Sequence, residues 1–185
     1  SHSGMHAQAL ERLRLDADIR RALERGEFLL HYQPLIDLAS GVAGSVEALI
    51  RWKHPQQGFL SPAAFLPLAE ELDLMIPIGE WVLKTACAQI KAWRRQGLES
   101  LFVSLNVPAQ QLADPALVGL IVSTLASDDL PADALGVELV ESSLIEGKEA
   151  TIRTLAELRA LGVHVSLDDF GTGYSSLSYL KRFPI

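Results

Sequence analysis

The sequence predicts an α/β fold, and two observations favour a closed (β/α)8 TIM-like barrel within that class. Apolar strand-like runs alternate with helical patterns between residues 28 and 168, as expected for parallel strands with helices outside them. Four of the strands also place a hydrogen-bonding side chain two residues after a very small one. A doubly wound open sheet gathers its ligand residues at one switch point, whereas a barrel collects them from many strands at its carboxyl-terminal mouth. We therefore expect an incomplete barrel, with about five strands visible in this chain.

Each predicted element has a local signal. Helices are indicated by apolar residues at helical spacing, and Gly26, Gly97 and Gly162 are placed to end three of them. A polar cap followed by proline begins two others, at Ser61 and Asp114. Turn-forming residues between the first two strands suit a hairpin. In chain order, the predicted elements are helix 9–25, strands 28–36 and 42–52, helices 61–72 and 79–96, strand 101–106, a helix after 114, strand 135–140, helix 148–161 and strand 163–168.

The amino-acid composition and net charge indicate which classes of protein this chain can belong to. The 185 residues are 49% hydrophobic, which suits one domain with a substantial core. A formal net charge of −7 disfavours a protein that binds nucleic-acid polymers through a basic surface, although a local arginine could hold a small anion. Cys87 is the single cysteine, so neither a disulfide nor a thiolate metal site is expected. No apolar run approaches the roughly 18 residues of a membrane span, so we expect a cytoplasmic domain, within a parent that could be membrane-anchored.

The small-then-polar pairs on the four strands point to one shared space. Side chains in a strand alternate between faces, so both members of each pair face the same way, with the small residue in the layer beneath. Burying three carboxylates and an amide together is costly unless a cation compensates them, and no histidine lies at ligand spacing. A single acidic residue of this kind more often forms a salt bridge than binds a metal ion. The four residues together, however, predict a site for Mg or Mn. The expected ligands are Glu47, Asn106, Glu138 and Asp168.

Three further polar residues adjoin this set. Asp169 follows Asp168 in a glycine-containing loop, so adjacent carboxylates could reach two ions; the alternative is an ordinary turn with solvated acids. Arg51 shares the strand face of Glu47 and could clamp a phosphate, although a surface ion pair is about as common in isolation. Gln33 could contact a ligand from the first strand, but a plain polar strand residue is the more frequent case.

Two motifs carry a family resemblance. The runs EALIRW at 47–52 and DDFGTGYSS at 168–176 resemble the signature motifs of EAL-domain cyclic di-GMP phosphodiesterases. Shorter segments resemble the family in the same order along the chain: 32–34, 65–70, Asn106 and 138–141. The resemblance extends from about Leu23 to the end of the chain. It implies a modified (β/α)8 barrel in which the first strand runs antiparallel to its neighbour.

The resemblance also implies a reaction. Family members hydrolyse one phosphodiester bond of cyclic di-GMP to linear pGpG in bacterial second-messenger signalling, using two Mg or Mn ions and a water between them. By position, one ion would be held by Glu47, Asn106, Glu138 and Asp168. Asp168 and Asp169 would serve the second ion, Gln33 and Arg51 would contact the substrate, and the catalytic group would comprise Glu47, Asp168 and Asp169.

The chain departs from the family pattern in two places. Val140 stands where a threonine is usual, and the chain stops before the strand expected to supply a lysine, with a glutamate and a glutamine further on. We expect residues 1–5 to be a cloning remnant, 6–26 a linker helix and 27–185 the N-terminal portion of the EAL domain. An upstream sensory domain and a homodimer are among the expected partners. The alternative function is a module that binds cyclic di-GMP or a protein without hydrolysis, or a fragment inactive for want of those residues.

Overall fold

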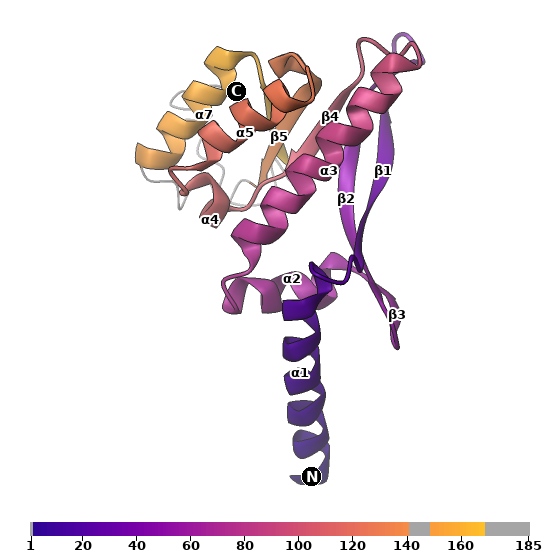
Figure 1. Ribbon diagram of the computed structural model, residues 1–185, viewed down its shortest axis with the longest axis vertical. Coiled ribbons are helices and arrows are strands. Elements are labelled where there is room, and N and C mark those ends of the chain that lie inside the picture. Colours follow the sequence, from indigo (N-terminus) through magenta and orange to yellow (C-terminus); the bar gives the residue numbers. More distant parts are fainter. Residues whose placement is uncertain (1, 141–148, 169–185) are drawn as a thin grey trace. The chain divides into compact units, whose positions relative to one another are not determined.

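The computed structural model describes residues 2–140 and 149–168 and confirms the alternation of strands and helices (Figure 1). The helices are α1 (His2–Ala22), α2 (Pro62–Glu71), α3 (Met75–Arg95), α4 (Ala109–Leu112), α5 (Leu117–Ser127) and α7 (Glu149–Leu161), with a short 3-10 turn at Ala132–Ala134. The strands are β1 (Phe28–Ile36), β2 (Ala43–His54), β3 (Gly58–Leu60), β4 (Phe102–Asn106), β5 (Leu135–Val140) and β6 (His164–Asp168). None of the helices in these ranges has the length and apolar character needed to cross a membrane.

Element ends differ from the prediction where local signals were weak. Helix α1 starts at His2 rather than at residue 9, since no proline interrupts the segment before it. Ser61 does occupy the N-cap of α2, but its side chain makes no capping hydrogen bond. Helix α5 begins at Leu117, later than expected, because the Asp114 carboxylate accepts a hydrogen bond from the Ala116 N–H at 3.0 Å and forms a turn first. Strand β3 and helix α4 were not predicted, because elements of three and four residues show no periodicity.

The chain folds into two compact units, each assembled from two sequence segments. The first unit contains Ser1–His31 and Ile50–Ile78, and the second contains Tyr32–Leu49 and Gly79–Ile185. The core of the first unit is aromatic: the Phe28, Trp52 and Phe65 rings lie with centroids 5.6 to 5.9 Å apart. Trp52 is fully buried, and its indole N–H donates to the Glu27 carboxylate at 3.1 Å. The buried indole polar atom therefore has a partner, as a stable core requires.

The sheet has the strand order β1-β2-β4-β5-β6, with β3 paired to β2. Strands β2, β4, β5 and β6 are parallel, and helical segments connect them. Strands β1 and β2 form a hairpin, in which the Asp37 N–H donates to the Val42 carbonyl at 3.1 Å. Because so short a loop cannot make the crossover that parallel strands need, β1 runs antiparallel to β2. Both expectations for the fold, a partial barrel and an antiparallel first strand, are confirmed.

The two faces of the parallel sheet differ in chemistry. In the second unit, helices α3, α5 and α7 lie on one side of β4 and β5 (Figure 1). The apolar side chains on that side are at most 6% exposed: Val46, Ala48, Val103, Leu105, Val137 and Leu139. Full burial of each larger side chain stabilises the fold by about 1.5–3 kcal/mol. This packing fixes the strand faces, so the residues between the apolar ones must face the other side.

Candidate functional site

The strand register places the expected ligands at three successive levels of the sheet. Asn106 on β4 pairs directly with Glu138 on β5. Glu47 on β2 pairs with Ser104, two residues below Asn106, while Asp168 pairs with Val140, two residues above Glu138. Parallel strands of a barrel are staggered in this way because closure requires a fixed shear. The positions of the polar residues are therefore shifted along the strand direction by two residues between β2 and β4, and by two more between β5 and β6.

Glu47 and Asn106 are in direct contact across β2 and β4. The Asn106 amide nitrogen donates a hydrogen bond to Glu47 Oε1 at 3.0 Å. Asn106 is exposed, whereas Glu47 and Glu138 are half-buried. Because the bond uses the amide NH2 group, the amide oxygen keeps its capacity to ligate a cation. Two carboxylates and an amide oxygen on three neighbouring parallel strands are a donor set that suits a hard divalent ion.

Two of the four small residues lie together in one layer beneath the polar groups, whereas Ser45 pairs with Phe102 and Ser166 with Glu138. Ser104 and Gly136 pair with each other in the layer beneath Asn106 and Glu138, and Ser104 is only 3% exposed. Because of the stagger, Ser104 also lies beside Glu47. A bulky side chain at Ser104 would compete with the Glu47 carboxylate for the same space. The layer therefore leaves room for the polar groups above it.

An aromatic contact that sequence reasoning missed lies on the same face. The Phe102 and His164 rings stack with centroids 3.8 Å apart and an interplanar angle of 15°. They meet across Gly136, where a Cβ atom would lie 3.1 Å from the Phe102 ring. Both residues precede an expected ligand by four positions, so period-two alternation does put them on the ligand face. The contact itself depends on the register, which the sequence does not display.

Gln33 on β1 points to the same side of the sheet as Glu47, which follows from the position of Tyr32, the residue before it. The Tyr32 ring packs edge-on against Trp93 of α3, with centroids 4.9 Å apart, and burial raises the pKa of Tyr32 to about 12. Tyr32 therefore points to the helical side of the sheet. Its successor Gln33, one residue along the strand, points to the opposite side and is exposed.

Arg51 and Asp168 are the other expected site residues within the described part of the chain. Arg51 belongs to the first unit, where it is half-buried and its Nη1 donates to the Ile50 carbonyl at 2.9 Å. Asp168 ends β6. Asp169 and the rest of the DDFGTGYSS motif lie outside the described residues. Within residues 2–140 and 149–168, no group of three or more His, Cys, Asp and Glu side chains is arranged to hold a metal ion, so the described donors supply only part of the expected ligand set.

Comparison with known proteins gives consistent matches. A family model described as "EAL domain" matches residues 16–185. The bifunctional diguanylate cyclase/cyclic di-GMP phosphodiesterase MucR of Pseudomonas aeruginosa is 45% identical over 182 residues, which cover 98% of this chain and 27% of MucR. The cyclic di-GMP phosphodiesterase PdeR of Escherichia coli is 41% identical over 181 residues, with the same two coverages of 98% and 27%. The chain thus spans about a quarter of the length of these relatives.

Solved structures agree with this match. A structure described as the PaMucR phosphodiesterase in complex with c-di-GMP superposes with a TM-score of 0.88 at 44% identity, covering 92% of this chain and 69% of that one. The EAL enzyme Bd1971, in its form with cAMP and cyclic-di-GMP bound, gives a TM-score of 0.86 at 31% identity, covering 100% of this chain and 51% of that one.

Proposed function

The chain belongs to the EAL domain family, and we propose that it forms part of a phosphodiesterase that hydrolyses cyclic di-GMP to linear pGpG. The observation that carries this proposal is the Glu47–Asn106 hydrogen bond at 3.0 Å, in a register that pairs Asn106 with Glu138. Together these bring three oxygen-bearing side chains to one face of the sheet, at or next to the carboxyl ends of the paired segments of β2, β4 and β5. That is where barrel enzymes hold their reacting groups.

In the proposed mechanism, Glu47, Asn106, Glu138 and Asp168 hold one Mg or Mn ion, and Asp168 and Asp169 serve a second. When bound, such ions lower the pKa of a coordinated water and compensate the charge on a phosphate. Asn106 orients the Glu47 carboxylate through their hydrogen bond, which fixes one ligand before an ion arrives. Arg51 pairs with a phosphate oxygen and Gln33 contacts the substrate from β1.

We further propose the wider setting of this activity. Residues 27–185 form the N-terminal portion of the catalytic domain, and residues 6–26 connect it to an upstream sensory domain in the cytoplasm. Supporting this, the matched relatives are several times longer than the chain. Helix α1 also buries only Ile19 and Ala22, as expected of a connecting helix.

Product analysis tests the proposed activity. The protein is incubated with cyclic di-GMP and Mn2+ or Mg2+, and pGpG is separated by chromatography. We expect metal-dependent formation of pGpG, which Glu47→Ala abolishes. Glu99→Ala is the matched control, because Glu99 is an exposed glutamate of the second unit away from the expected ligands. Binding of metal and cyclic di-GMP without any pGpG would instead favour the non-hydrolytic module.

A further inference from the structure

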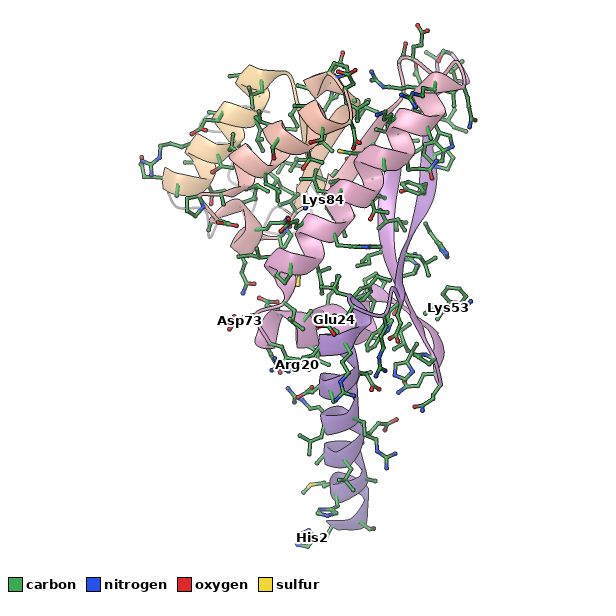
Figure 2. All side chains as sticks on the ribbon, in the orientation of Figure 1. His2, Arg20, Glu24, Lys53, Asp73 and Lys84 are labelled. Atoms are coloured by element: carbon green, nitrogen blue, oxygen red, sulfur yellow. The ribbon has the colours of Figure 1, made fainter. Side chains whose placement is uncertain are left out.

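A three-stranded ribbon in the first unit presents one buried and one exposed face. Lys53 on β2 pairs with Phe59 on β3, and the Lys53 N–H donates to the Glu27 carbonyl at 2.9 Å. The neighbouring residues Trp52 and His54 are 0% and 3% exposed, so they form the inner face. Lys53 lies on the outer face, and Figure 2 shows its side chain projecting outward from the ribbon. Phe59 is 59% exposed, so more than half of its surface makes no contact within the unit.

The outer face brings together an aromatic ring and an ammonium group. The Lys53 Nζ lies 6.0 Å from the centroid of the Phe59 ring. The His31 ring lies on the same side, with its centroid 6.0 Å from that of Phe59 at an angle of 49°. Among the described residues, no carboxylate pairs with Lys53, in contrast to Lys84, which is bonded to Glu80 at 2.7 Å. The ammonium charge of Lys53 is therefore available to an anion.

The combination of an exposed π face and a cation fits one class of ligand better than others. A base stacks on an aromatic ring while the attached phosphate pairs with a nearby cation, and both contacts tolerate a solvent-exposed surface. An acidic peptide would use the Lys53 charge but would have no need of the Phe59 face. Arg51 precedes Lys53 by two residues on β2, so the two cations share one strand face.

We propose that Phe59 stacks against a guanine base of cyclic di-GMP while Lys53 pairs with a phosphate of the same ligand. This inference rests on the proposed function, because it extends the substrate contact of Arg51 along the same strand face. It makes Phe59 and Lys53 determinants of substrate affinity. His31 on β1, which also neighbours β2, contacts the Phe59 ring from the side.

Equilibrium binding of a hydrolysis-resistant phosphorothioate analogue of cyclic di-GMP tests the inference. Stacking on an aromatic side chain contributes about 1–3 kcal/mol per base, so Phe59→Ala should raise the Kd roughly 5- to 150-fold. Phe59→Leu should weaken binding similarly, since leucine is apolar but has no π face. Phe59→Trp should retain binding, and ligand should quench the fluorescence of the new indole. Lys53→Ala should weaken binding and reduce its dependence on salt concentration.

Control variants separate this inference from the proposed function. Lys84→Ala removes an exposed lysine of α3, and Leu38→Ala removes an apolar side chain that is 99% exposed; neither should change the Kd. Near-ultraviolet circular dichroism checks that the buried Trp52 keeps its environment in each variant. If Phe59→Ala or Phe59→Leu binds as tightly as the wild type while Arg51→Ala does not, the stacking role is wrong and the proposed function stands. If the wild-type protein does not bind the analogue, both are overturned.

Discussion

Replacing Asn106 by aspartate tests the arrangement of the expected metal site directly. The change exchanges the amide that donates to Glu47 Oε1 at 3.0 Å for a second carboxylate. Two unit charges 3.0 Å apart repel by about 1.4 kcal/mol in water and about 5.5 kcal/mol at an effective dielectric constant of 20. Asn106 is exposed and Glu47 half-buried, so the lower part of that range applies. We expect Asn106→Asp to lower the free energy of unfolding by about 1–3 kcal/mol at neutral pH without metal.

Thermal unfolding with and without Mn2+ is the assay. A chain of this size loses about 2–4 °C in Tm per kcal/mol, so the metal-free variant should unfold about 2–12 °C below the wild type. The deficit should shrink in saturating Mn2+, which compensates both charges. Asn106→Ala is the control, since it removes the hydrogen bond without adding charge. If Asn106→Asp behaves like Asn106→Ala under all conditions, the two side chains do not lie as described.

Three further outcomes are expected. Phe65→Ala should lower the free energy of unfolding by about 3–5 kcal/mol in urea titrations, because the ring is fully buried against Phe28 and Trp52; a loss below about 1 kcal/mol would contradict that packing. Burial, with a smaller contribution from Asp128, raises the pKa of the Cys87 thiol to about 12, so native labelling near pH 8 should be about 1,000-fold slower than for a free cysteine; a rate close to that of the denatured protein would refute this. Burial also raises the folded-state pKa of Tyr32 to about 12. The stabilising contribution of the neutral phenol is therefore complete below about pH 10 and is lost as the pH rises from 10 to about 12. Tyr32→Phe should flatten the dependence of the free energy of unfolding on pH in that range, and an unchanged dependence would contradict the burial of Tyr32.

The sequence was sufficient for features that depend on local alternation. Strand β5 has the predicted ends, and the separation of Glu138 from Leu139 by face follows from period two alone. The expected layer of small residues is present only in part: Ser104 and Gly136 are partners, but Ser45 pairs with Phe102 and Ser166 with Glu138 because of the stagger. The side-chain faces need only the spacing of residues along one strand.

Features that depend on pairing between distant segments could not be predicted from the sequence. Nothing local indicates that Glu47 pairs with Ser104 rather than with Asn106, since a register shift of two residues preserves every side-chain face. The stacking of Phe102 on His164 follows from two such registers and from the missing side chain of Gly136. The surface around Phe59 escaped prediction because β3 is only three residues long.

The boundaries between the two compact units fall inside regular elements rather than in loops. The chain passes from one unit to the other between His31 and Tyr32 within β1, between Leu49 and Ile50 within β2, and between Ile78 and Gly79 within α3. Domain boundaries ordinarily lie in linkers that can be cut or extended, but here each crossing is held by hydrogen bonds of a strand or a helix. Neither unit can therefore be excised as a continuous segment, and the strand that bears Glu47 is completed by the unit that buries Trp52. Damage to the aromatic core should thus destabilise β2 along its whole length rather than in one unit alone.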